Sequence, residues 1–198
     1  MSVQPRTVGL GQWLFHNRSW LPAPIVIWAV VITQPLSIFT GAGIGLMLLG
    51  QCIRLWGISH MGPDARSSTA VVRKLIYTGP YELSRNPLYI GNIIIFIGLA
   101  TASGGPLFAV QVGALFVAYF NLIVRFEEDF LERRLGEIYR SYRNRVPRWL
   151  GESAPVHAAT PKRAIEDRAQ ITLRAERTTM VLIAVVSVLI VIRAVIVG

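Results

Sequence analysis

The sequence predicts an all-α, polytopic membrane protein with about five transmembrane helices, and three observations support this. Apolar residues make up 53% of the 198 residues and charged residues only 16%, whereas a soluble domain usually carries about a quarter charged residues. The apolar residues gather into runs that each approach the roughly 20 residues a helix needs to cross a bilayer. The basic residues lie mostly between these runs.

The apolar runs set the expected boundaries of the spans. They cover residues 21–38, 41–59, 87–103, 106–124 and 178–198. The first run contains Pro35 near its end, where we expect a kink or an early end of the helix, because proline lacks the backbone N–H that a helix uses. This run starts late and lacks a small-residue cleavage pattern, so we do not expect a secretory signal peptide.

Positive charge falls on one side of the predicted membrane. With five spans, residues 1–20, 60–86 and 125–177 share one side, and they hold all of the 20 Lys and Arg residues except Arg54 and Arg193. Because basic loops remain in the cytoplasm, we expect a cytoplasmic N-terminus and a C-terminus on the opposite side, in a bacterial inner membrane or an equivalent one. The net charge of +9 then faces anionic lipid headgroups rather than nucleic acid.

The segments on the basic side differ in character. Residues 62–74 read as a loop, and residues 126–142 read as a helix because apolar residues recur there at helical spacing. Residues 151–164 are rich in proline and alanine and are typical of a linker. Residues 165–177 are expected to form a charged helix that leads into the last span.

The chain is therefore expected to have three parts. A four-span body covers residues 1–150, a cytoplasmic linker and charged helix cover residues 151–177, and an additional transmembrane helix covers residues 178–198. The sequence does not indicate an oligomeric state.

Cysteine and histidine give no sign of a metal centre. The single cysteine, Cys52, excludes a disulfide within the chain. The three histidines, His16, His60 and His157, are far apart and lack ligand spacing. We expect no metal site, and chemistry must depend on polar residues at the ends of the spans.

The stretch "SRNPLYIGN" opens the third span. Asn86 is a favourable N-cap residue whose side chain can accept a hydrogen bond from an unpaired backbone N–H. Pro87 suits the first helical position because its missing N–H would have had no partner. Arg85 has two possible roles: its guanidinium extends to the lipid phosphates, or it belongs to a functional site.

Two adjacent carboxylates follow the fourth span. The short outer connection makes spans three and four antiparallel neighbours, so Glu127 and Glu128 are expected to approach Arg85. The simplest alternative is an interfacial ion pair, worth about 0–1 kcal/mol if it is solvated. Arg54 lies inside the second span, where a charged residue is costly and often functional; its alternative role is to extend to the membrane surface.

Two stretches together resemble a known family. They are "LIYTGPYELSRNPLYIGN" (75–92) and "EEDFLERRLGEIYRSYRNRVPRW" (127–149). In order and spacing they resemble the isoprenylcysteine carboxyl methyltransferase and phospholipid methyltransferase superfamily of integral membrane enzymes, over about residues 50–150. The matching positions are Gly79-Pro80-Tyr81, Arg85-Asn86-Pro87, Tyr89, Gly91, Glu127-Glu128, Leu131, Leu135-Gly136, Tyr139, Tyr142 and Val146-Pro147-Arg148.

The resemblance implies a methyltransferase that uses S-adenosyl-L-methionine (SAM) without a Rossmann domain, acting on a lipophilic carboxylate, a phospholipid amine or a thiol. It implies that the cofactor lies between the start of span three and the helix after span four. The implied catalytic residues are Arg85, Glu127 and Glu128, and Arg54 joins them as a candidate for acceptor binding because of its place inside the second span. The implied cofactor-binding residues are Gly79, Tyr81, Arg85, Asn86, Pro87, Tyr89, Gly91, Glu127, Glu128, Tyr139, Tyr142 and Arg145.

The sequence departs from the family pattern at two positions. Asn86 stands where the family usually has histidine, and Glu82 stands where a basic residue is common. Two alternatives therefore remain open. One is a membrane-embedded NADPH-dependent reductase of the sterol-reductase type, and the other is a non-catalytic membrane scaffold that binds a lipid or a partner.

Overall fold

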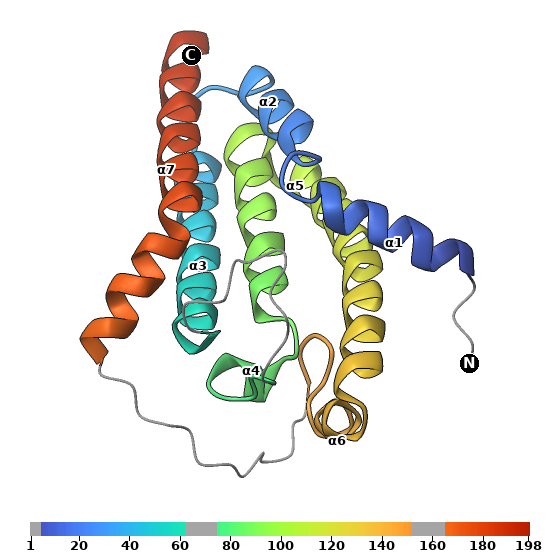
Figure 1. The fold of residues 1–198 in the computed structure, drawn as a ribbon. Coiled ribbons are helices and arrows are strands. Elements are labelled where there is room, and N and C mark those ends of the chain that lie inside the picture. Colours follow the sequence, from blue (N-terminus) through green and yellow to red (C-terminus); the bar gives the residue numbers. More distant parts are fainter. Residues whose placement is uncertain (1–4, 62–74, 152–164) are drawn as a thin grey trace.

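The computed structural model describes residues 5–61, 75–151 and 165–198, and within them the chain is helical, without strands. The all-α membrane class predicted from the sequence is therefore confirmed. The predicted loop at 62–74 and most of the predicted linker at 151–164 lie outside the described residues. The helices, shown in Figure 1, are α1 (Pro5–Asn17), α2 (Ala23–Val31), α3 (Ile38–Met61), α4 (Pro80–Leu83), α5 (Pro87–Leu135), α6 (Glu137–Arg145) and α7 (Ile165–Val197).

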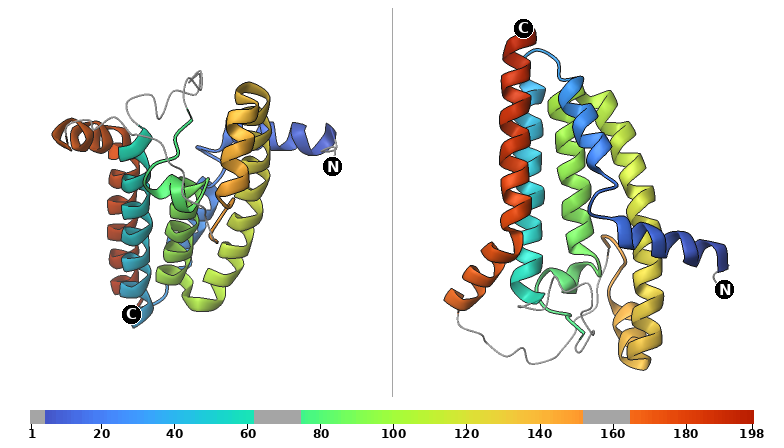
Figure 2. Two further views of the ribbon diagram at one scale, coloured as in Figure 1. Left: turned by 90° about the horizontal axis from the view of Figure 1, so that it is seen from below. Right: turned by 45° about the horizontal axis from the view of Figure 1, so that its top comes forward.

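Helix α5 reverses direction and supplies two neighbouring legs of the bundle. Its helical geometry is interrupted at Gly105, which has a φ of 75° and precedes Pro106. A positive φ is accessible to glycine at little cost, and proline is well suited to begin the second leg. Figure 2 shows the two legs running antiparallel from this turn. The predicted helices at 87–103 and 106–124 and their short connection are confirmed.

The first predicted span, 21–38, is wrong in its extent. Only α2 is helical there, and its 9 residues span about 14 Å at 1.5 Å per residue, which is about half of a bilayer core. The chain leaves helical geometry after Val31, ahead of Pro35, and regains it at Ile38. Helix α1, which the sequence analysis did not predict, precedes α2. Three described helices, α3, α5 and the α7 portion from Ala169, are long and apolar enough to cross a membrane.

Helix α3 packs tightly against the first leg of α5 because glycines face each other across the contact. A Cβ added at Gly50 would lie 2.6 Å from the Gly91 carbonyl oxygen, and one added at Gly91 would lie 2.7 Å from the Gly50 carbonyl oxygen. Small residues allow helix backbones to approach closely in a bilayer. This contact fixes the start of α5 against α3.

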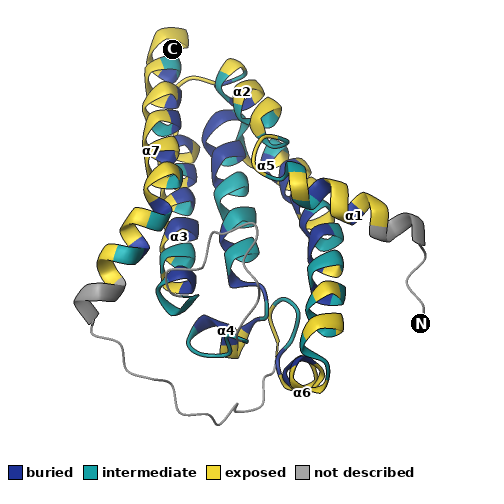
Figure 3. Cartoon of the chain, viewed as in Figure 1, coloured by how far each residue is buried: buried dark blue, intermediate teal, exposed yellow. Residues whose placement is uncertain are grey.

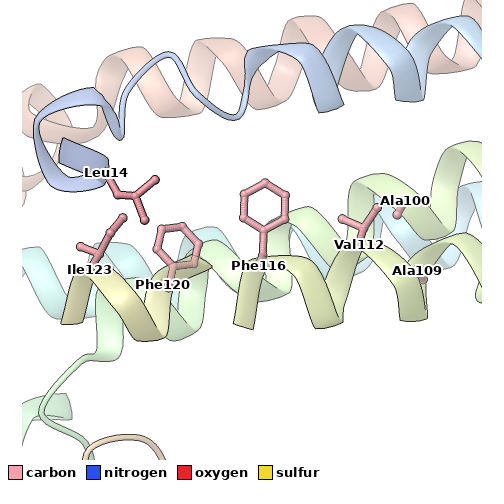
Figure 4. Packing of buried hydrophobic residues seen from close by; sticks show 7 residues of the cluster. All are labelled: Leu14, Ala100, Ala109, Val112, Phe116, Phe120 and Ile123. Atoms are coloured by element: carbon pink, nitrogen blue, oxygen red, sulfur yellow. The ribbon is translucent and has the colours of Figure 1, made fainter. Parts of the chain in front are cut away.

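Two apolar clusters hold the remaining helices. Figure 4 shows the first, in which Leu14 of α1 points toward Phe120 and Ile123 of the second α5 leg. The second cluster brings Ile190 of α7 together with Met47 of α3 and other buried residues. Helix α7 therefore shares a core with the bundle. Its outward face is exposed and apolar (Figure 3), as expected for a surface that contacts lipid.

Two short helices, α4 and α6, lie at the end of the bundle where α5 begins and ends (Figure 1), which we call the motif end. The predicted continuous helix at 126–142 is interrupted there. It is divided by Gly136, whose φ of 57° ends α5 and precedes α6. The predicted charged helix at 165–177 is confirmed as the first part of α7, which continues without a break into the last span.

Candidate functional site

Asn86 directly precedes α5 at the N-cap position, but its side chain does not cap the helix. The structure gives Asn86 no side-chain cap hydrogen bond. Its Nδ2 instead donates to the Arg148 carbonyl oxygen at 3.1 Å and to Glu128 Oε1 at 3.4 Å. The cap expected from the sequence is wrong, because the carboxamide is turned away from the first turn of α5 toward these acceptors. Pro87 occupies the first helical position, as predicted, and is buried.

Glu128 is clamped between two guanidinium groups. Arg85 Nη2 lies 3.0 Å from Glu128 Oε1, and their side chains are only 9% and 8% exposed. Arg148 Nη2 and Nε donate to Glu128 Oε2 at 2.7 Å and 3.0 Å. The approach of Arg85 to the acidic pair, expected from the antiparallel legs, is therefore observed. Both oxygens of this carboxylate are already occupied by the protein's own cations.

Backbone contacts reinforce the same clamp. The Arg85 N–H donates to the Pro147 carbonyl oxygen at 3.0 Å, and Arg85 Nη1 donates to the Arg143 carbonyl oxygen at 3.0 Å. Ser84 Oγ donates to the Arg148 carbonyl oxygen at 3.2 Å. Residues far apart in sequence are thus joined at the motif end, and the "SRNP" stretch is held by the segment that follows α6.

The two tyrosines of α6 are part of a packed core. Tyr139 and Tyr142 are buried with Val146, and the Tyr142 hydroxyl donates to the Tyr81 carbonyl oxygen at 2.7 Å. Burial raises the pKa of Tyr139 and of Tyr142 well above the usual value, so both hydroxyls keep their protons at neutral pH. Arg145, which the resemblance places with them, is exposed on α6 and does not join this cluster.

Glu127 has different neighbours from Glu128. It is half-buried, and the Tyr89 hydroxyl and the positive charge of Arg18 lie near enough to act on it. Arg18 follows α1 and was not predicted as a site residue. The adjacent carboxylates of the motif are therefore separated: one is fixed by arginines, and the other meets tyrosine.

The Tyr81 hydroxyl is a buried polar group that has no hydrogen-bond partner among the described residues. Burial is the main cause of its raised pKa, the charge of Glu127 raises the pKa further, and that of Arg54 opposes the shift. The hydroxyl therefore lies within electrostatic range of both side chains. Gly79, which precedes α4, packs against the His60 ring at the end of α3. The Tyr81 hydroxyl lies beside α3, because a Cβ added at Gly57 would be 3.7 Å from its oxygen.

The guanidinium of Arg54 does not extend to the membrane surface but is paired with other side chains inside the bundle. Its Nε and Nη2 donate to the two carboxylate oxygens of Glu176 on α7, at 3.0 Å and 2.7 Å. Its Nη1 donates to Asn92 Oδ1, and Gln51 Nε2 also donates to Glu176 at 3.1 Å. Its aliphatic stem lies against Gly91, because a Cβ there would be 2.7 Å from Arg54 Cγ.

Glu176, Asn92 and Gln51 were not among the residues predicted from the sequence. A signal for Glu176 was present, since it is the only acidic residue within 169–197, and a single carboxylate at the start of an apolar helix requires a partner. Arg148 was part of the family pattern but not of the predicted site. The described structure thus brings Arg85, Asn86 and Glu128 into contact at the motif end, whereas Arg54 lies deeper in the bundle with Glu176 and Arg145 is exposed.

Several known proteins are similar to this chain in sequence. A family model described as phospholipid methyltransferase matches residues 38–138, just over half of the chain. The chain is 28% identical over 112 residues to protein-S-isoprenylcysteine O-methyltransferase B from Arabidopsis thaliana, covering 53% of this chain and 55% of that protein. It is 31% identical over 111 residues to a probable protein-S-isoprenylcysteine O-methyltransferase from Oryza sativa subsp. indica, covering 52% and 56%.

A third relative carries a different name. The cobalt-zinc-cadmium resistance protein CzcN from Cupriavidus metallidurans is 26% identical over 149 residues, covering 71% of this chain and 64% of that protein. The chain thus spans little more than half the length of the methyltransferase relatives. No solved structure matches.

Proposed function

Because the chain belongs to the phospholipid methyltransferase family, we propose that it is an integral membrane enzyme that transfers a methyl group from SAM to a lipophilic or membrane-associated acceptor. The observation that carries the proposal is the convergence of polar groups from three helices at the motif end. The Tyr81 hydroxyl of α4 lies there within electrostatic range of Glu127 on α5 and of Arg54 on α3, and the Glu128 clamp lies at the same end of the bundle. The charge distribution of the sequence supports a motif end that faces the cytoplasm.

The residues present fit the proposed cofactor. SAM carries a positive sulfonium, an ammonium group and the hydroxyls of a ribose, and a carboxylate such as Glu127 suits each of these. The buried Tyr81 hydroxyl has no partner in the described structure, and an unsatisfied buried polar group is costly. A ligand with polar groups would satisfy it. The absence of a side chain at Gly91 allows α3 and the stem of Arg54 to lie directly against this part of α5.

The chemistry asked of the protein is limited. SAM supplies a methyl group that is already activated by its positively charged sulfur. The side chains therefore need to bind, align and exclude water. In this proposal Glu127 and Tyr81 hold polar groups of the cofactor. The clamp at Glu128 holds the start of α5 and the segment after α6 together, and these form the wall of the cofactor site. Tyr139 and Tyr142 seal this wall, because their rings fill the space between α4, α5 and α6.

The acceptor is proposed as an amphiphile that enters from the bilayer. The plant relatives are named as isoprenylcysteine O-methyltransferases, and the family description names phospholipids. A lipophilic carboxylate agrees best with Arg54, a cation near the Tyr81 hydroxyl. A phospholipid amine and a thiol are the other acceptor classes that a labelling experiment must distinguish.

The proposal is tested first by binding. The purified protein in nanodiscs is titrated with SAM, with its demethylated product and with NADPH. We expect saturable binding of SAM and of the product. Glu127→Gln should weaken it at least about tenfold, because a charge-assisted hydrogen bond is worth about 1.5–3 kcal/mol. Glu137→Gln is the matched control, since Glu137 is 83% exposed and pairs only with Arg140 among the described residues.

Other outcomes would overturn the proposal. Binding of NADPH alone would favour the reductase alternative, and binding of none of the three would favour a scaffold. A second measurement identifies the product: membranes that contain the protein are incubated with methyl-labelled SAM, and the labelled lipid or protein fraction is separated. Label in a base-labile ester indicates a carboxylate acceptor, and label in a phospholipid headgroup indicates an amine.

A further inference from the structure

A completely buried carboxylate lies on the last helix, outside the region matched by the family. The Glu176 side chain is 0% exposed and the Arg54 side chain 12% exposed, and Arg54 Nη2 lies 2.7 Å from Glu176 Oε1. The pair is bidentate, because Arg54 Nε also donates to the other oxygen of Glu176 at 3.0 Å. Such pairing fixes the plane of the guanidinium as well as its position.

The pair lies well inside the bundle. Arg54 precedes the end of α3 at Met61 by seven residues, which is about 10 Å of helix. Charged groups at such a depth in a membrane protein are costly and are often part of a functional site. Replacing a buried ion pair with apolar residues of similar size is often neutral or stabilising. Stability alone therefore gives no reason for a buried Arg–Glu pair at this position.

The pair is connected to the proposed site through Arg54. The stem of Arg54 lies against Gly91, and its guanidinium donates to Asn92, so it contacts the first turns of α5 after the "SRNP" stretch. The same charge acts on the unpartnered Tyr81 hydroxyl. Any movement of Arg54 would therefore change the polar surroundings of the site.

We propose that Glu176 is a positioning residue that holds Arg54 in place for the anionic group of the acceptor, so that α7 completes the site from outside the family region. This inference rests on the proposed function. Gln51 contributes to the same arrangement, because it donates to Glu176 Oε2 from the turn before Arg54. Glu176 does not itself touch the acceptor; it limits the directions in which the guanidinium can point.

The test compares three full-length variants in nanodiscs. They are Glu176→Leu, the double variant Arg54→Met with Glu176→Leu, and Ile183→Ala as a control for the packing of α7, since Ile183 is a buried residue of the shared core. For each we measure the thermal midpoint, the SAM dissociation constant and the initial rate of methyl transfer to native membrane acceptors at saturating SAM.

The single variant leaves Arg54 buried without its partner, so its thermal midpoint should fall. The double variant removes both charges, and its midpoint should return close to that of the wild type. Its SAM dissociation constant should stay within about twofold of the wild-type value, while methyl transfer stays at least about tenfold slower, which corresponds to about 1.4 kcal/mol. Ile183→Ala should lower the midpoint and leave the rate unchanged.

The outcomes separate the inference from the proposed function. If the double variant recovers both stability and rate, the pair is structural and the inference is wrong. If the double variant stays as unstable as the single one, the charges are needed for folding and a positioning role is likewise rejected. If the wild type binds no SAM and transfers no methyl group, the proposed function fails, and the inference falls with it.

Discussion

Replacing Glu128 with glutamine tests whether this carboxylate holds together the segments that meet at the motif end, namely both ends of α5 and the segment after α6. The substitution keeps the shape of the side chain but removes its charge, which leaves Arg85, 9% exposed, without its partner. Breaking a buried ion pair by removing one partner costs about 3–5 kcal/mol. The lower end applies here, because Arg148 is 33% exposed and water can solvate it. Arg85 also keeps its bond to the Arg143 carbonyl oxygen.

We therefore expect the free energy of unfolding to fall by about 3 kcal/mol, which corresponds to a thermal midpoint lower by about 6–12 °C for a chain of this size. The assay is thermal unfolding in detergent, followed by tryptophan fluorescence. Glu132→Gln is the matched control. Glu132 also pairs with two arginines, Arg140 and Arg143, but that site is solvated, and the midpoint should change much less.

One specific result would contradict a structural role for Glu128. If Glu128→Gln kept the wild-type midpoint and lost SAM binding, Glu128 would be a ligand-binding residue and not a clamp. The opposite pattern is expected for Glu127→Gln, which should keep its midpoint and lose affinity. The two variants thus assign separate roles to residues that are adjacent in the sequence.

Three further predictions follow from the motif end. Asn86→Ala should lower the free energy of unfolding by about 1–2 kcal/mol, because two hydrogen bonds are lost. Asn86→Asp should lower the thermal midpoint more than Asn86→Ala does, whereas a residue whose side chain caps the helix would tolerate aspartate. Gly91→Val should prevent folding or SAM binding, since its Cβ meets the backbone of α3; normal binding would contradict the close contact. Burial raises the pKa of Tyr139 and Tyr142, so the unfolded state loses these protons at a lower pH than the folded state does. The thermal midpoint should therefore fall as the pH rises above about 10. A midpoint independent of pH in that range would contradict their burial.

The sequence predicted the long helices well because their signal is local. Apolar runs of sufficient length define α3, both legs of α5 and the last part of α7, and each is observed. The length of the first predicted helix was overestimated because hydropathy alone does not indicate the residue at which a helix ends. Residues 32–37 are partly apolar but lie around Pro35 and are not helical. Helix α1 was missed because its residues are not apolar enough to form a run.

The contacts of the site were predicted only where topology alone determined them. Antiparallel legs brought Arg85 to the acidic pair, but topology did not say which glutamate would receive it. The pairing of Arg54 with Glu176 depends on the packing of α7 along α3, which no local pattern indicates. The Asn86 cap failed for the same reason: a helix-start rule considers only the first turn, and here a distant carbonyl and carboxylate compete for the side chain.

The separation of Glu127 from Glu128 follows from helix geometry. Successive residues of an α-helix are about 100° apart around its axis, so adjacent side chains do not share a face. Glu128 points to Arg85 and Arg148, and Glu127 lies on a different face of the helix, where its charge acts on Tyr89 and Tyr81. An acidic pair at this position can thus both hold the two legs of α5 together and present a carboxylate to a cationic ligand. A single glutamate could not do both, because a carboxylate that already binds two guanidinium groups has little affinity left for a sulfonium or an ammonium group.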